Sequence, residues 1–199
     1  MAGTLDIPNL DQARAVIVHP APDHVAALMR QLNAIGLSVT NAWPDLPASA
    51  ITADFIFYDT DMGHDAQFPW GPGTAPMPMI ALVGTEAPGR IEWAARMGAD
   101  ALLLKPVGSS GAFSALLMAR HSFELRRTLT SEIKQLRQRM SARQTVVQAV
   151  ALLSAQGKSQ DAAYDQLRQL AMAWRINVEE AAARIVKNAT DKGILRDSH

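Results

Sequence analysis

Two hydrophobic periodicities divide the chain. Up to about residue 110, short apolar runs alternate with stretches of helical spacing, and after Gly111 only the helical period remains. We expect strands at five apolar runs: 14–19, 37–43, 54–59, 79–84 and 101–105. Helices are expected at 22–35 and 90–98, where apolar residues recur every three to four positions and a glycine ends the run. Alternating strands and helices predict an α/β domain with a five-stranded parallel sheet.

One connection in this first half departs from the pattern. Residues 63–78 are rich in glycine and proline and leave little room for a helix between the third and fourth strands. We therefore expect the helix at this crossover to be short or absent.

The second half begins with a long helix. No proline or glycine interrupts residues 112–156, which predicts one helix of roughly 60 Å. Apolar residues keep the 4-3 spacing of a coiled coil at Leu129, Ile133, Leu136, Met140 and Val147. Arg143 takes one position of this seam, and upstream the pattern fails because Leu125 is one place out of register. We expect a parallel homodimer joined through this helix; the alternative is a helix packed on its own domain.

Two shorter helices follow. Ser159 is a typical N-cap, and a break near residues 175–177 separates two stretches of helical spacing. With the end of the long helix they predict a small three-helix bundle. The predicted domains are therefore 1–110, a coiled-coil helix over 111–142, and 143–199.

The neutral net charge conceals a segregation of charges. Residues 1–110 carry 5 basic and 11 acidic side chains, whereas residues 111–143 carry 7 basic and 2 acidic ones. Contact with a polyanion, if any, is thus expected in the C-terminal half, although a solvated long helix would also be rich in charge.

Several classes of function are disfavoured by composition and motifs. The chain has no cysteine, its five histidines are scattered, and P-loop, GxSxG and GxGxxG motifs are missing. We expect no enzyme, no catalytic residue, no metal and no cofactor. No apolar run approaches the ~20 residues of a membrane span, and residues 1–12 lack a basic signal-peptide region, so we expect a cytoplasmic protein.

The first half resembles the receiver domains of response regulators, which have a flavodoxin-like sheet. The segments DFIFYD and GADALLLKP carry the resemblance, and they place Asp59 at the phosphoacceptor position and Lys105, before Pro106, at the phosphoryl-contacting position. Other receiver features are missing. His19 and Pro20 stand where receivers have two magnesium-binding acids, with Asp23 and Asp61 nearby but off the pattern. Val83 replaces the usual hydroxyl residue, and Thr85 comes two residues late. We therefore expect a pseudo-receiver that is not phosphorylated, in which Asp59 pairs with Lys105.

Residues 143–186 resemble the ANTAR domain, an RNA-binding module of transcription antiterminators. RQTVVQAVALL, AYDQLRQLAM and VEEAAARIV carry this resemblance, although Val150 and Ala151 replace its usual Lys-Gly pair. We expect Ala149, Leu152, Tyr164, Leu167 and Met172 to pack in the bundle. The basic residues expected to be free for RNA are Arg139, Arg143, Arg168, Arg175, Arg184 and Lys187. Trp174 either stacks on an unpaired base or caps the bundle.

A receiver-like head, a long helix and a C-terminal ANTAR segment, in this order, resemble the AmiR-like antiterminators. The resemblance implies a protein that binds a leader mRNA hairpin and is controlled by a partner, such as a ligand-sensing regulatory protein, rather than by phosphate. Two other hypotheses stay open. One is a response regulator that is phosphorylated or binds DNA, and the other is a coiled-coil interaction module without RNA binding.

Overall fold

The computed structural model of the chain describes residues 10–155 and 157–194, with side chains as far as residue 191. The expected lack of a signal peptide concerns a segment that lies mostly outside these residues, as does the end of the third predicted domain. The chain divides into two compact units, residues 1–128 and 129–199. One helix, α3 (Ala112–Ser154), begins in the first unit and ends in the second.

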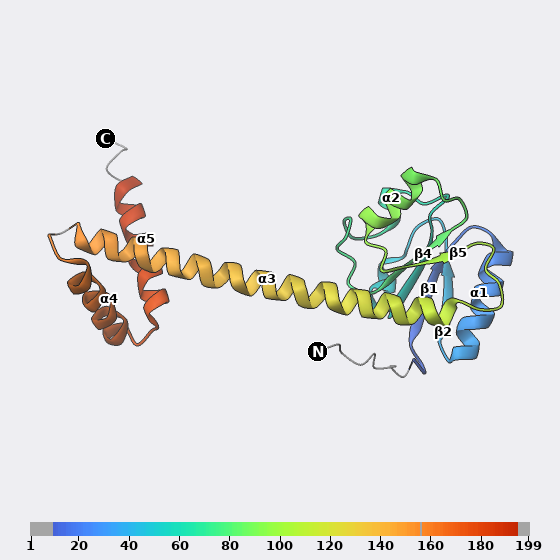
Figure 1. Cartoon of the computed structure of the whole chain (residues 1–199), viewed down its shortest axis with the longest axis horizontal. Helices are drawn as coiled ribbons and strands as arrows, with labels where there is room; N and C mark the ends of the chain where they lie inside the picture. The colour runs from blue at the N-terminus through green and yellow to red at the C-terminus, as the bar shows by residue number, and fades with distance from the viewer. Residues whose placement is uncertain (1–9, 156, 195–199) are drawn as a thin grey trace. The chain divides into compact units, whose positions relative to one another are not determined.

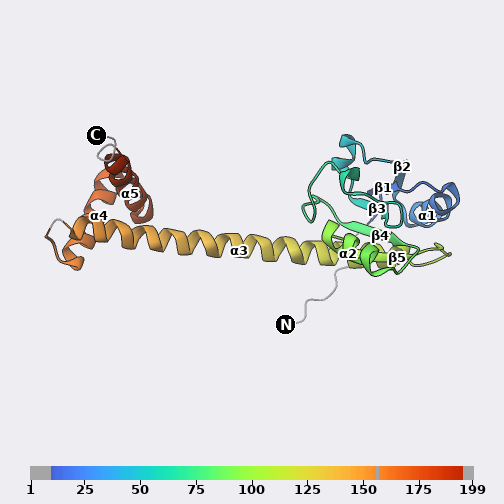
Figure 2. The same ribbon diagram turned by 90° about the horizontal axis from the view of Figure 1, so that it is seen from above.

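Unit 1 is built on a sheet of five parallel strands in the order β2-β1-β3-β4-β5 (Figures 1 and 2). The strands are β1 (Arg14–Val18), β2 (Ser38–Ala42), β3 (Phe55–Asp59), β4 (Met79–Val83) and β5 (Ala101–Leu104). Each predicted strand agrees with the observed one to within one residue at either end. The order is that of flavodoxin-like domains, in which ligands meet the sheet at the carboxyl ends of the strands where the order reverses. Here that point lies between β1 and β3.

Helices cover both faces of this sheet. On one face α1 (Pro22–Ile35) and the start of α3 pack their apolar side chains, such as Leu32 and Leu116, against Phe57 of β3. On the other face α2 (Pro88–Met97) and the connecting segments pack against Tyr58. The middle strands β3 and β4 are buried throughout, which explains why both are apolar along almost their whole length rather than alternating.

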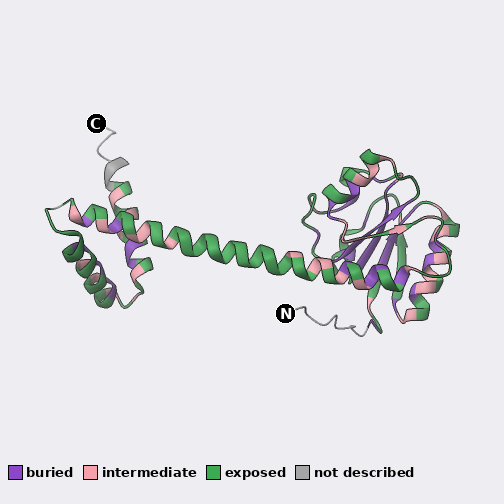
Figure 3. Ribbon diagram, viewed as in Figure 1, coloured by how far each residue is buried: buried purple, intermediate pink, exposed green. Residues whose placement is uncertain are grey.

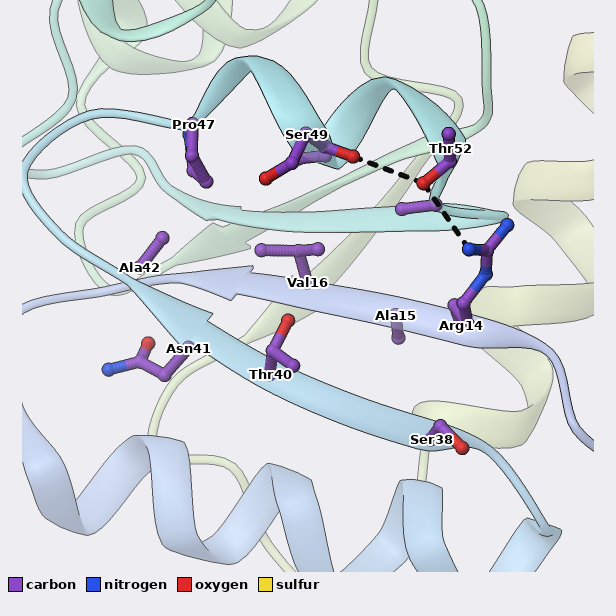
Figure 4. Close-up of a pocket in the computed structure, with 12 residues that line it drawn as sticks. Arg14, Ala15, Val16, Ser38, Thr40, Asn41, Ala42, Pro47, Ser49 and Thr52 are labelled. Carbon is purple, nitrogen blue, oxygen red and sulfur yellow. Dashed lines mark hydrogen bonds between the residues drawn. The ribbon is translucent and has the colours of Figure 1, made fainter.

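Two connections of the sheet carry only single turns of 3-10 helix. They are η1 (Ala48–Thr52), between β2 and β3, and η2 (Asp65–Gln67), between β3 and β4. The expectation that the helix between the third and fourth strands is short or absent is thereby confirmed. Beside η1 a groove of about 380 Å³ lies over β1 and β2 (Figure 4). At one end of the groove the guanidinium of Arg14 donates to Thr52 Oγ1 at 3.3 Å.

Unit 2 is the predicted three-helix bundle, formed by the end of α3, α4 (Gln160–Trp174) and α5 (Val178–Ile194). Ser159 caps α4, since its hydroxyl accepts the Ala162 N–H at 3.2 Å, and Arg175 ends the helix with a φ of 57°. The buried core is mostly alanine, with two leucines: Ala149, Leu153, Ala163, Leu167, Ala171, Ala181 and Ala182. Among the described residues, no helix is both long and apolar enough to cross a membrane.

Candidate functional site

Four charged or titratable side chains meet at the carboxyl edge of the sheet. The register pairs Val18 of β1 with Tyr58 of β3, so His19 and Asp59 follow side by side on neighbouring strands. Lys105 follows β5 at the same edge, and Asp61 lies in the loop after β3. The strands therefore position His19, Asp59 and Lys105, and the loop after β3 positions Asp61.

Lys105 joins the two carboxylates of this cluster. Its ammonium group donates to Asp59 Oδ1 and lies 2.6 Å from Asp61 Oδ2. Asp59 is only 1% exposed, and its second oxygen accepts the Met62 N–H at 3.0 Å. The predicted pairing of Asp59 with Lys105 is thus present in the structure, and the lysine is shared with a second acid.

Asp61 lies off the receiver pattern in the sequence, but its contacts place it in this cluster. Its Oδ2 accepts the Gly84 N–H at 3.0 Å and its Oδ1 accepts the Thr85 N–H at 3.0 Å. A β-carbon on Gly84 would lie 2.5 Å from Asp61 Oδ2 and 2.9 Å from Lys105 Cε, so a larger residue here would have to displace one or both of these side chains. The loops after β3 and β4 are therefore tied together through the Asp61 side chain.

The charged state of this cluster follows from competing effects on each pKa. Burial alone would raise the pKa of Asp61, but hydrogen bonds from Lys105 and from the Thr85 and Gly84 amides lower it below its ordinary value. Burial alone would lower the pKa of Lys105, but its hydrogen bonds to Asp59 and Asp61 raise it. Both Asp61 and Lys105 are therefore charged at neutral pH.

His19 is held as a neutral side chain behind Asp59. Its Nδ1 accepts the Ala21 N–H at 2.9 Å, and its Nε2 lies 3.6 Å from Asp59 Oδ1 and 3.4 Å from Lys105 Nζ. Burial, together with the positive charge of Lys105 and the neighbouring His24, lowers the pKa of His19, although Asp59 opposes the shift.

The residues at this edge do not fit the Mg²⁺ ion that receiver phosphorylation requires. A hard cation needs carboxylates at the end of the first strand, and that position holds a histidine and a proline. Within the described part of the chain, no three histidine, aspartate or glutamate side chains are grouped so that they could hold a metal ion.

The hydroxyl groups near this edge have other roles. Val83, at the position of the missing hydroxyl, is buried, and the buried Thr60 hydroxyl donates to the Leu82 carbonyl at 2.9 Å. Thr85 reaches the cluster only through its backbone N–H. The groove beside η1 has no acid or histidine among its twelve lining residues (Figure 4).

In unit 2 the six basic residues expected to be free are all exposed: Arg139, Arg143, Arg168, Arg175, Arg184 and Lys187. Arg184 has one aromatic partner, since its guanidinium lies 4.7 Å from the ring centre of Trp174. The Trp174 ring is half-buried against the bundle core, which agrees with the interpretation of Trp174 as a cap on the bundle.

Three residues expected to pack in the bundle lie on its surface instead. Leu152, Tyr164 and Met172 are 39%, 43% and 70% exposed, whereas Ala149 and Leu167 are buried as predicted. The helical phase explains the error in α4. Ala163, Leu167 and Ala171 form its inner face, and residues one position later are rotated by about 100° away from it. Tyr164, Arg168 and Met172 therefore share an outer face.

The apolar seam predicted in α3 is also uncovered in the single chain. Every residue from 127 to 141 is exposed, as Figure 3 shows for the middle of the helix. Leu129, Ile133, Leu136, Met140 and Val147 are between 49% and 69% exposed. Upstream the 4-3 pattern ends for a structural reason, because Arg126 belongs to unit 1 and pairs with the buried Asp100 at 3.1 Å.

Comparison with known proteins identifies the family. Residues 13–120, more than half of the chain, match the family described as "AmiR, N-terminal". The chain belongs to the AmiR family. Residues 134–186 match the ANTAR domain, so this AmiR family member is an AmiR-like ANTAR antiterminator with a receiver-like domain. Both matched families are regulatory rather than enzymatic.

Individual relatives cover different parts of this AmiR family chain. The aliphatic amidase regulator of Pseudomonas aeruginosa strain PAO1 is 24% identical over 184 residues, which are 90% of this chain and 94% of that protein. A receiver domain of a modulated diguanylate cyclase from Desulfovibrio desulfuricans G20 is 19% identical, with a TM-score of 0.45, and covers 58% of this chain and 99% of its own. The chemotaxis response regulator CheY4 of Vibrio cholerae is 20% identical, with a TM-score of 0.39, and covers 58% of this chain and 98% of its own.

Proposed function

We propose that this protein is a dimeric RNA-binding antiterminator whose receiver-like domain is controlled by a bound protein and not by phosphate. The observation that carries RNA binding is the outer face of α4, which lies within the ANTAR segment and exposes Tyr164, Arg168 and Met172 together. An aromatic ring beside an arginine suits an unpaired base and its phosphate, because the ring stacks and the guanidinium donates.

The other exposed basic residues of unit 2 also support RNA binding. Arg139 and Arg143 on α3, with Arg175, Arg184 and Lys187 near or on α5, bring positive charge to the helices of unit 2. The ligand that we infer is a hairpin in leader mRNA, whose loop offers unstacked bases. The similarity to an aliphatic amidase regulator supports a leader that controls an enzyme operon.

Control by a partner protein is inferred from the carboxyl edge of unit 1. Asp59 is buried and paired with Lys105, and the position of the magnesium-binding acids holds His19 and Pro20. A domain that cannot bind Mg²⁺ beside its acceptor has lost the usual route for phosphoryl transfer. We therefore infer that the signal arrives through a protein contact, for which a ligand-sensing regulatory protein is the proposed source.

The dimer is inferred from the uncovered seam of α3. Helices in proteins gain most of their stability from packing of an apolar face, and here fifteen successive residues, 127–141, are all exposed in the single chain. A second copy of the same helix would cover Leu129, Ile133, Leu136 and Met140 at once. We accordingly retain the division into a receiver-like domain over 1–110, a dimerisation helix over 111–142 and an ANTAR domain over 143–199.

The test of RNA binding compares charge variants of the full chain in electrophoretic mobility assays. The probe is an RNA hairpin with an unpaired loop, with duplex DNA as competitor. Arg168→Gln should bind several-fold more weakly, whereas Arg30→Gln, an exposed arginine of α1, should bind like the wild type. Circular dichroism checks that both fold, since exposed substitutions of this kind usually change stability by less than about 0.5 kcal/mol.

Two outcomes would contradict the proposal. If duplex DNA competes as well as the hairpin, the protein is a DNA-binding regulator, because recognition then needs no unstacked base. If no nucleic acid is bound, the interaction-module hypothesis replaces the antiterminator.

A further inference from the structure

Three N–H donors converge on the carboxylate of Asp61. The Gly84 and Thr85 amides each lie 3.0 Å from one of its oxygens, and the Lys105 ammonium lies 2.6 Å from Oδ2. Successive backbone amides together with a lysine form the kind of concavity that binds oxyanions in proteins. In this chain the concavity is filled by a carboxylate of the chain itself.

The filled site is next to Asp59, because Lys105 donates to both carboxylates. Any anionic group attached to Asp59 that reached both Lys105 and the Gly84 amide would need the space of the Asp61 oxygens. No spare room exists there, since even a β-carbon on Gly84 would lie 2.5 Å from Asp61 Oδ2. Asp61 and an added oxyanion are therefore alternative occupants of one place.

We propose that Asp61 is a built-in ligand of an oxyanion site formed by Gly84, Thr85 and Lys105. The side chain holds the loop after β4 against Lys105 as a bound phosphoryl group would, without any phosphate. This inference rests on the proposed function, since it explains how a receiver-like domain keeps its site occupied when phosphorylation is lost. Removing the carboxylate should leave a site for a small oxyanion such as sulfate or inorganic phosphate.

The experiment measures the backbone amides of Gly84 and Thr85 in the full chain by proton–nitrogen correlation spectra and hydrogen exchange. In Asp61→Ala these two amides should exchange at least ten-fold faster than in the wild type. Titration with sulfate should then shift both resonances and slow their exchange again. In the wild type, sulfate should leave both unchanged, because Asp61 occupies the site.

Two further variants separate the loss of charge from the loss of volume. Asp61→Asn still fills the site without a charge, so its amides should exchange faster but no sulfate should bind. Asp23→Ala removes an exposed acid from the first turn of α1, after β1, and should behave like the wild type in both measurements. Asp61→Asn also preserves the side-chain volume and serves as the main variant if Asp61→Ala does not fold.

The proposal is overturned if sulfate shifts Gly84 and Thr85 equally in the wild type and in Asp61→Ala, because the site is then not occupied by Asp61. It is also overturned if the Asp61 variants leave the exchange of both amides unchanged. Neither readout involves RNA. A protein that fails to bind RNA but responds in this way would contradict the proposed function and retain the oxyanion site.

Discussion

A charge placed in the seam of α3 should separate the proposed dimer. Leu136 lies in the middle of the 4-3 stripe and is 56% exposed in the single chain. Complete burial of a leucine side chain stabilises by about 1.5–3 kcal/mol, so covering the exposed half contributes about 1 kcal/mol per chain and about 2 kcal/mol per dimer.

Leu136→Asp removes this contribution and adds a cost. Two carboxylates would face each other in a seam that excludes water, and their desolvation and repulsion add roughly 3 kcal/mol or more. A total near 5 kcal/mol weakens association several thousandfold. We expect the wild type to be a dimer at micromolar concentration and Leu136→Asp to be a monomer by sedimentation equilibrium.

The matched control is Leu125→Asp, which makes the same change in the same helix. Leu125 is 53% exposed but lies one position outside the register of the seam, so this variant should remain a dimer. A monomeric wild type at micromolar concentration would refute the reasoning. So would a Leu136→Asp protein that associates as tightly as Leu125→Asp.

Three other outcomes are expected. Acetyl phosphate or beryllofluoride with Mg²⁺ should leave the mass and the oligomeric state unchanged, and stoichiometric modification of Asp59 would contradict this. Burial lowers the folded-state pKa of His19 below 6.5, with Lys105 and His24 adding to the shift and Asp59 opposing it, so protonation favours the unfolded chain. The free energy of unfolding from urea titrations should fall as the pH drops below 6.5, by at most about 1.4 kcal/mol per pH unit. His19→Asn should make this dependence on pH weaker. The same dependence in the wild type and in His19→Asn would contradict the role of His19. Arg126→Gln should cost about 2 kcal/mol in the same titration, because it removes the side-chain partner of a carboxylate that is only 3% exposed, whereas the exposed Arg127→Gln should be neutral.

The fold of unit 1 could be predicted closely because its strands are short apolar runs bounded by proline, glycine or polar residues. The run from Phe55 to Asp59 is buried on both faces, and its five-residue length and aromatic content favour a strand over a helix. The phase of the 4-3 stripe in α3 likewise depends only on spacing along one helix. The pairing of Asp59 with Lys105 was suggested by the resemblance to receiver domains, and in the structure both residues end parallel strands at the same edge of the sheet.

The role of Asp61 could not be predicted in this way. Spacing along the chain gives positions on strands and helices, but Asp61 lies in a loop, and its contacts with Gly84 and Thr85 depend on how that loop turns back. The outward orientation of Tyr164 and Met172 was missed for another reason. Apolar residues occur on both sides of α4, and only the packing of the alanines in the bundle decides which side faces inward.

The contacts of Asp61 also restrict how this sequence can evolve. An acid in place of His19, the first step toward a magnesium-binding receiver, would bring a third carboxylate to a place where Asp59 and Asp61 already share one ammonium group. Loss of Asp61 as the first step would leave the Gly84 and Thr85 amides without the carboxylate to which they donate, and Lys105 with Asp59 alone. Each of these two changes is unfavourable by itself. A lineage that carries this cluster would therefore have to change several of its residues together to regain control by phosphate.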